Sequence, residues 1–153
     1  DKLLQTLLIP RKSFQTMLQR HFNTEYEQMT KQFNRIKGKD GEEMAAKWLI
    51  DHGYQLIERN NSTKYGELDI IATKNDILVF VEVKFKQTED FGTPEEMIGQ
   101  NKLMQVRRTA ELYLLTNPDI AKSFEKYQID AICIVGPPDG EASRISHHEN
   151  LTF

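Results

Sequence analysis

The sequence predicts an α/β or α+β domain built on one sheet, preceded by a helical extension. The chain has 153 residues, of which 39% are hydrophobic, and this is enough for one hydrophobic core. Amphipathic segments with a period of three to four residues flank several apolar runs that are typical of strands. Their order is helix, three strands, helix, then one or two strands, so helices are expected to cover the faces of the sheet.

Residues 1–36 are predicted to form an amphipathic helical extension. Apolar side chains recur there at steps of three and four, and polar and charged side chains occupy the other face. The apolar stripe consists of Phe14, Leu18, Phe22, Tyr26, Met29, Phe33 and Ile36. We expect it to pack on the domain or on a second copy of the chain, as in a homodimer. A membrane-surface helix is disfavoured because acids are mixed with the bases.

Residues 37–153 are predicted to form the folded domain, which begins with the helix "GKDGEEMAAKWLIDHGY" and stops at Gly53. Its buried face should consist of Met44, Ala45, Trp48 and Leu49. Three strands are expected next, in "YQLIERN", "LDIIATK" and "ILVFVEVKF". Asn75 and Asp76 should form the turn between the second and third strands.

The second large helix is expected over "TPEEMIGQNKLMQVRRTAELYLLT". Thr93 would be its N-cap, Pro94 its first residue, and Glu96 would complete a capping box. The apolar run "YQIDAICIVG" predicts a buried strand that contains Cys133. "SRISHHENLTF" is expected to add a last edge strand, and the histidines within it are interpreted as edge or tail residues rather than metal ligands.

Charge and cysteine usage limit the classes of function. The net charge of −3 argues against a protein that binds nucleic acid by bulk charge, but it is compatible with a carboxylate site beside a local basic strip. A single cysteine cannot form an internal disulfide and favours a reducing cytoplasm. The apolar runs are too short to span a bilayer, and the first residues do not resemble a signal peptide, so no membrane role is expected.

Acidic residues interrupt the apolar strands in a pattern that suggests chemistry. Side chains alternate along a strand, so Glu82 and Lys84 share one face, as do Glu67 and Asp69. If the two strands pair through the predicted turn, Asp69 comes close to Glu82. Two converging carboxylates repel each other unless a cation lies between them, and Mg²⁺ or Mn²⁺ suits such oxygen ligands.

A lysine beside such acids favours hydrolysis of phosphodiesters. Lys84 could orient or deprotonate a water, or stabilise charge on a phosphate under attack. The alternative is that Glu82 and Lys84 lie on a solvated strand face, a common arrangement. The apolar run from Ile77 to Val81 favours a covered strand, and buried carboxylates are rare without a partner or a metal.

Four segments together resemble the YraN family, a branch of the PD-(D/E)XK nuclease superfamily related to Holliday-junction resolvases. They are "GKDGEEMAAKWLIDHGYQLIERN", "YGELDIIA", "LVFVEVK" and "FGTPEEMIGQNK". The resemblance implies a restriction-endonuclease-like mixed central sheet flanked by helices. It begins near Gly38 and does not include the N-terminal extension. The proline of the superfamily's name is absent, because Glu67 and Leu68 precede Asp69.

The resemblance also implies roles for individual residues. Asp69 and Glu82 would bind the metal, Glu42 would face it from the first helix, and Lys84 would be the catalytic lysine. Glu67 would be either a helper ligand or a structural hydrogen-bond acceptor. Lys102 could touch a phosphate or be a solvated helix lysine.

The leading interpretation is therefore an endodeoxyribonuclease that depends on Mg²⁺ or Mn²⁺. Branched or structured DNA is suggested only by the kinship with resolvases, and RNA stays open as a substrate. The alternative is a catalytically inactive module that keeps the fold and binds DNA or a protein partner. Basic residues that could form a DNA-contacting rim are Lys37, Lys39, Lys64, Lys86, Arg107 and Arg108.

Overall fold

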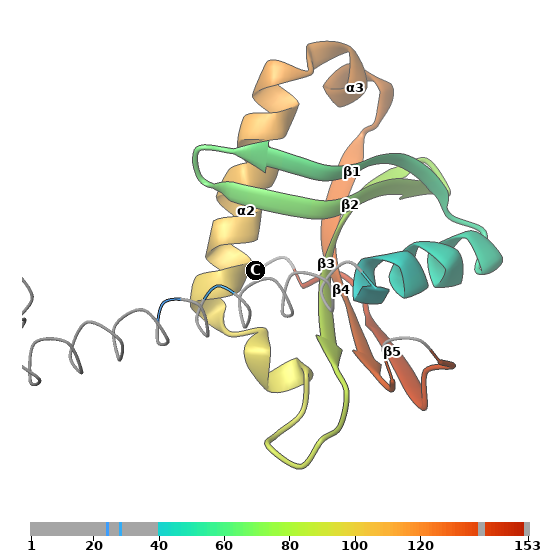
Figure 1. Ribbon diagram of the computed structural model, residues 1–153. Coiled ribbons are helices and arrows are strands. Elements are labelled where there is room, and N and C mark those ends of the chain that lie inside the picture. The colour runs from blue at the N-terminus through green and yellow to red at the C-terminus, as the bar shows by residue number, and fades with distance from the viewer. Residues whose placement is uncertain (1–23, 25–27, 29–39, 138–139, 152–153) are drawn as a thin grey trace, which may run out of the picture. The chain divides into compact units, whose positions relative to one another are not determined.

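The computed structural model describes residues 24, 28, 40–137 and 140–151 (Figure 1). The chain divides into two units, Asp1–Ile36 and Lys37–Phe153. Apart from two helical residues, Thr24 and Gln28, the predicted amphipathic extension lies outside the described residues. Lys37 and Lys39 lie outside them too, so their place in a DNA-contacting rim stays a prediction.

The described part of the second unit begins with a helix over residues 40–51. The elements that follow are β1 (Gln55–Thr63), β2 (Gly66–Lys74), β3 (Ile77–Lys86), the 3₁₀ turn η1 (Glu95–Met97), α2 (Gln100–Thr116), α3 (Pro118–Ser123), β4 (Lys126–Val135) and β5 (Arg144–His148). The strands form one sheet in the order β1-β2-β3-β4-β5. β3 and β4 are parallel, whereas the other neighbouring strands are antiparallel.

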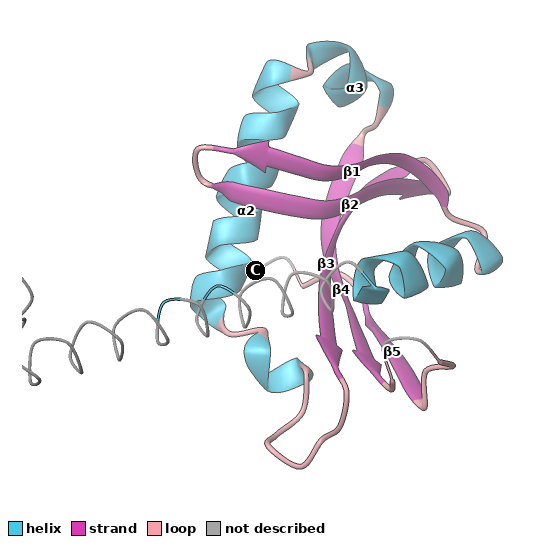
Figure 2. Ribbon diagram, viewed as in Figure 1, coloured by secondary structure: helices cyan, strands magenta, loops and turns pink. Residues whose placement is uncertain are grey.

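Helices cover both faces of this mixed sheet. The helix of residues 40–51 packs on one face, and α2 packs on the other (Figure 2). The parallel pair needs a crossover between its strands, and the chain makes it through α2 and α3. The arrangement is a restriction-endonuclease-like fold, as the resemblance implied.

The helix of residues 40–51 ends where the sequence predicts. Gly53 has a φ of 83°, and its N–H donates to the Ile50 carbonyl at 3.0 Å. The N–H of Tyr54 donates to the Leu49 carbonyl at 3.0 Å, which completes a Schellman motif. Leu49 and Ala45 are fully buried, which confirms the predicted apolar face of this helix.

The hairpin between β2 and β3 confirms the predicted turn. Asn75 and Asp76 have φ values of 52° and 62°, and two such residues in succession make a type I′ turn. The twist of this turn matches that of the strands it joins, so pairing begins at once between Lys74 and Ile77. The turn thereby sets the register that carries toward Asp69 and Glu82.

The side chains of β3 alternate between two cores. Val79, Val81 and Val83 pack with the helix of residues 40–51. Leu78 and Phe80 pack with α2. The alternation predicted from the sequence is confirmed, and it assigns the later even-numbered positions of β3 to the face that α2 covers.

The predicted start of the second large helix was wrong. α2 begins at Gln100 with Gly99 as its N-cap, and the residues before it form the separate turn η1. The proposed cap at Thr93 is not formed, because η1 has Pro94 as its N-cap and no side-chain cap hydrogen bond. Glu95 is held instead by the guanidinium of Arg144, so a tertiary ion pair shapes this segment.

None of the described helices combines the length and the hydropathy that crossing a bilayer requires.

Close packing at Gly41 gives a test of how the first described helix meets the sheet. A Cβ on Gly41 would lie 2.6 Å from Cβ of Phe85, so Gly41→Ala must push the helix from β3. We expect a loss of about 1–3 kcal/mol in the free energy of unfolding, measured in urea. Gly99→Ser is the control for an added Cβ, because Gly99 has open space around it, a φ of −83° and an N-cap position that favours serine. Equal stability of the two variants would contradict this packing.

Candidate active site

The candidate site lies where β2 and β3 separate. Their pairing runs from the turn only as far as Ile70 and Val81. Beyond that point β2 pairs with β1, and β3 pairs with β4, so the sheet forks (Figure 1). At the fork the N–H of Val83 donates to Oδ2 of Asp69 at 2.8 Å. The Asp69 carboxylate thus binds a backbone donor that strand pairing leaves free.

Asp69 has an unusually high pKa for an aspartate. Burial and, next, the negative charge of Glu82 are the main causes that raise this pKa to about 7. The hydrogen bond from Val83 lowers the pKa, whereas the charge of Glu42 raises it and that of Lys84 lowers it. The positive charge of Lys84 therefore does not offset the effect of burial and of the neighbouring acids on the Asp69 carboxyl.

Glu82 is the most deeply placed acid of the group. Its side chain is 2% exposed, and its Oε1 accepts from Nζ of Lys84 at 2.5 Å. Nζ of Lys102 lies 2.9 Å from the same oxygen. Lys102 comes from the first turn of α2, so two lysines from different elements meet one buried carboxylate. The sequence grouped Glu82 with Lys84, but it left open whether Lys102 would be a solvated helix lysine.

Glu42 joins this charge cluster from the first described helix. Burial raises its pKa, a hydrogen bond from the Asn60 side chain lowers it, and the charges of Glu67 and Glu82 raise it. Glu67 itself stays exposed on β2. The structure therefore brings Glu42, Asp69 and Glu82 within electrostatic reach of one another, with Glu67 at the edge nearest Glu42.

The donor set fits a hard divalent cation. Carboxylate oxygens are the ligands that Mg²⁺ and Mn²⁺ prefer. The observation that supports such an ion is the convergence of the Asp69 carboxylate, held by the Val83 N–H, with the buried carboxylate of Glu82; burial and the charge of Glu82 accordingly raise the pKa of Asp69. Residues that could hold the ion are Asp69 and Glu82, with Glu42 close by.

The residues predicted to contact DNA have different surroundings. Nζ of Lys86 donates to the carbonyls of Phe91 and Gly92 at 3.0 and 2.8 Å, and therefore holds the loop that follows β3. Lys64 lies over the ring of Tyr65, with Nζ 5.0 Å from its centroid. Arg107 pairs with Glu111.

A different group of residues could also hold a metal ion. Ligand atoms of Glu95, Cys133 and His148 lie within 4.8 Å of one another, on the face of the sheet that η1 covers. Arg144 already donates to both oxygens of Glu95 and lowers the pKa of Glu95 to about 2. Burial raises the pKa of the Cys133 thiol to about 12. The sequence analysis missed this group because its members lie far apart in the chain.

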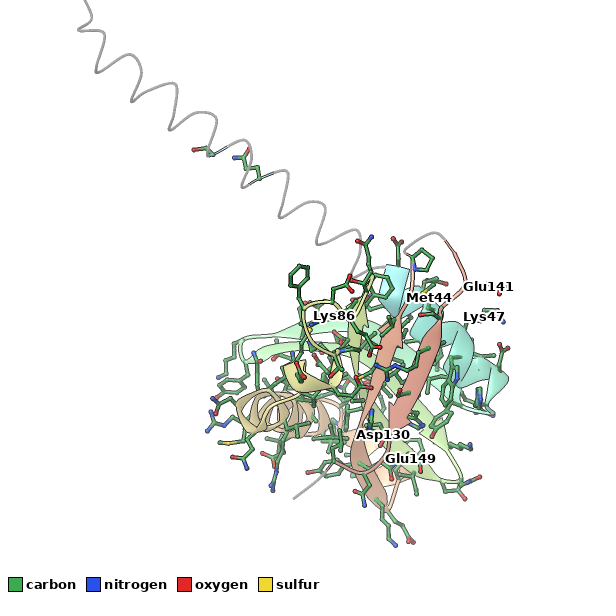
Figure 3. All side chains as sticks on the ribbon, turned by 90° about the horizontal axis from the view of Figure 1, so that it is seen from below. Met44, Lys47, Lys86, Asp130, Glu141 and Glu149 are labelled. Atoms are coloured by element: carbon green, nitrogen blue, oxygen red, sulfur yellow. The ribbon has the colours of Figure 1, made fainter. Side chains whose placement is uncertain are left out.

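A second feature missed from the sequence is a fully buried acid on the opposite face. Oδ2 of Asp130 lies 2.8 Å from Nε2 of His147, and its Oδ1 accepts from the Gln128 side chain and the backbone N–H of Asn150. In Figure 3, Asp130 lies well apart from Lys86. These bonds tie β5 and the chain after it to β4, in keeping with the edge-strand role expected for His147.

The fold and the cluster of acids and lysines define a nuclease-like member of the restriction-endonuclease-like class. The family described as "Uncharacterised protein family UPF0102" matches residues 41–134. The chain belongs to this family, which is the YraN family that its motifs resemble.

Curated relatives agree with this assignment. A "UPF0102 protein" of Syntrophomonas wolfei is 41% identical over 114 residues, which cover 74% of this chain and 95% of the relative. One of Persephonella marina is 45% identical over 83 residues, covering 54% of this chain and 72% of the relative. One of Dictyoglomus turgidum is 38% identical over 108 residues, covering 71% and 89%.

The raised pKa of Asp69 predicts that the stability of the protein depends on pH. With a folded pKa of about 7 against an ordinary 3.8, the folded state binds more protons between these values. The free energy of unfolding must therefore fall as pH rises through this window and level off above it.

Asp69→Asn removes this titration while leaving an oxygen to accept from Val83. In metal-free buffer we expect equal stability of both proteins near pH 4, and a wild type weaker by on the order of a few kcal/mol near pH 8. Urea unfolding of both proteins across this range measures the difference. A constant difference would show that Asp69 ionises normally in the folded state.

Proposed function

We propose that this protein is a metal-dependent endonuclease that hydrolyses phosphodiester bonds of DNA. The observation that carries the proposal is the buried Glu82 carboxylate with Lys84 on it, beside an Asp69 whose charge is unbalanced. Membership of the family supports a nuclease-like protein. The substrate, the cofactor and the reaction are the further steps of this proposal.

Each residue has a role that follows from its surroundings. Asp69 and Glu82 hold the cation, and the hydrogen bond from Val83 fixes the Asp69 side chain in the orientation it needs. Glu42, which interacts electrostatically with both Asp69 and Glu82, would add a ligand directly or through water. When bound, Mg²⁺ or Mn²⁺ lowers the pKa of water and neutralises phosphoryl oxygens.

The lysines would act once the cation has changed the balance of charge. Glu82 would then share its carboxylate between the cation and the two ammonium groups that it now holds. Lys84 would then orient a water or take its proton, and Lys102 would contact a phosphoryl oxygen. Glu67 is better placed to bias Glu42 than to bind the ion, because it lies exposed on β2.

DNA is proposed over RNA on the kinship with resolvases, which also suggests branched substrates. A cytoplasmic location is proposed because the single cysteine, Cys133, is a buried thiol. Dimerisation through residues 1–36 is proposed from the apolar stripe of the sequence.

Cation binding can be tested apart from activity. Mg²⁺ or Mn²⁺ should raise the melting temperature of the wild-type chain, because a ligand that binds only the folded state stabilises it. Asp69→Asn and Glu82→Gln should lose most of this increase, whereas Lys47→Gln, on a helix at the other face, should keep it. An equal increase in all four proteins would exclude these acids as the ligands.

The reaction itself is tested by cleavage of linear, nicked and four-way-junction DNA with and without Mg²⁺. We expect Lys84→Ala to lower the rate by about 10²–10⁴-fold, the range for general acid–base groups. Lys47→Gln, which changes the same net charge, should cut like the wild type. If the wild-type chain binds these DNAs but cuts none of them in the presence of Mg²⁺, an inactive DNA-binding module is supported instead.

Lys102 gives a separate test of the phosphate contact. Lys102→Met should lower the cleavage rate by about 10²–10³-fold, as loss of a donor to developing charge does. The fold should survive, because Glu82 keeps Lys84 as its partner. Lys122→Gln, on α3, is the control. A rate equal to that of this control would leave Lys102 as a surface lysine.

A further inference from the structure

A hollow of about 480 Å³ lies between α2 and the turn that joins β1 to β2. We call it the hairpin groove, and its lining residues are Tyr65, Arg108, Glu111, Leu112 and Leu115. None of the acids proposed to bind metal belongs to it. Its volume lies within the range of about 300–1,000 Å³ that is usual for small-molecule sites.

The turn that borders the groove is fixed by specific contacts. Nε2 of Gln105 donates to the carbonyl of Tyr65 at 3.1 Å, which ties the turn to α2. Gly66 follows with a φ of 148°, and a Cβ there would lie 2.8 Å from the same amide nitrogen. The turn is braced from within, since Oγ1 of Thr63 donates to the Gly66 carbonyl. Tyr65 therefore stands in a position set by the backbone.

The groove and the residues next to it combine an aromatic surface with an excess of positive charge. The Tyr65 side chain is half exposed, and Lys64 lies over its ring. Glu111 is neutralised by Arg107, whose Nε lies 3.0 Å from it. Arg108 makes no ion pair with any residue that the structure describes. The groove thus offers Arg108 as a cation beside a half-exposed ring, and Lys64 adds a second cation next to that ring.

The groove also connects to the candidate active site along α2. Lys102, Gln105 and Arg108 follow one another at steps of three residues, so Lys102 and Arg108 are about 9 Å apart along the helix axis. Lys102 contacts Glu82, and Gln105 contacts the turn that carries Tyr65. A nucleic-acid strand that leaves the acids beside α2 would reach the hairpin groove next.

We propose that the hairpin groove binds an unpaired nucleotide next to the bond to be cut, with its base on Tyr65 and its phosphate on Arg108. The proposal rests on the nuclease function and specifies its substrate as DNA with a single-stranded stretch. Basic grooves with aromatic platforms bind single strands, because every base offers a π-face. A duplex hides these faces in its stack and offers only phosphates and groove edges.

The test measures binding without cleavage, in EDTA, with the full chain. Fluorescence anisotropy compares a blunt duplex with the same duplex carrying a single-stranded extension. We expect wild-type protein to prefer the extended duplex. Tyr65→Leu should weaken that complex by about 5- to 100-fold and leave the blunt complex nearly unchanged. Tyr65→Phe keeps the ring and should bind like the wild type.

The phosphate contact has its own measurement. Arg108→Gln should weaken binding to the extended duplex and reduce the slope of log affinity against log salt by about one. Lys47→Gln, on the opposite face of the sheet, should leave the slope unchanged. A 2-aminopurine at the first unpaired position should be quenched by wild-type protein and by Tyr65→Phe, but not by Tyr65→Leu.

Three results would overturn the inference. The first is equal affinity of the wild type for both duplexes. The second is equal affinity of Tyr65→Leu and Tyr65→Phe for the extended duplex. The third is a Leu115→Ser variant that changes the oligomeric mass but leaves DNA binding unchanged. The last would make the groove a protein interface. These binding measurements require no cleavage. If the Tyr65 variants bind as expected but the chain does not cut DNA, only the proposed reaction is rejected. If the chain cuts DNA but the Tyr65 variants bind alike, only the groove proposal is rejected.

Discussion

The hydrogen bond from the Val83 N–H to Asp69 is the interaction on which the site depends. If β2 and β3 had stayed paired beyond Ile70 and Val81, the ladder would have used this donor. The strands diverge instead, and a side chain replaces the lost backbone partner. Divergence opens space at a point that both faces of the sheet can reach. Glu42 can therefore approach from one helix while Lys102 approaches from the other.

Burying acids at this fork requires a balance of charge that the chain provides only in part. Glu82 is almost inaccessible, and buried carboxylates at such depth need partners. Lys84 and Lys102 supply two charges to one oxygen of Glu82. Among the residues that the structure describes, neither Asp69 nor Glu42 forms an ion pair with a lysine, and burial and the charges of neighbouring acids raise the pKa of each.

The close approach at Gly41 is what brings Glu42 to this region. The helix of residues 40–51 begins almost in contact with Phe85 of β3, where any larger residue than glycine would meet the Cβ of that side chain. Its neighbour Glu42 is consequently held near the fork rather than turned to solvent. A local packing constraint thus positions a charged side chain, in the way that glycine commonly permits close approach of backbones.

Features set by neighbouring residues could be predicted from the sequence. Alternation along β3 placed Glu82 and Lys84 on one face, and the Asn75-Asp76 turn set the register that brings Asp69 opposite. Features set by distant residues could not. Glu95 binds Arg144, 49 positions later, so the capping pattern before α2 was misleading. The contact between Lys102 and Glu82 likewise needed the packing of α2 on the sheet, which no local pattern specifies.

The same reasoning separates the two places where a cation could bind. Near η1, the Glu95 carboxylate already has the guanidinium of Arg144 on both oxygens, and the Cys133 thiol is neutral because burial raises its pKa. A metal there must displace one cation and expel a proton from a buried sulfur. At the fork an ion must also compete with Lys84 and Lys102 for Glu82, but Asp69 makes no ion pair with any described residue and gains charge balance when an ion binds. Binding of a cation is therefore more favourable at the fork than near η1. This difference supports the proposal that Asp69 and Glu82 hold the metal ion.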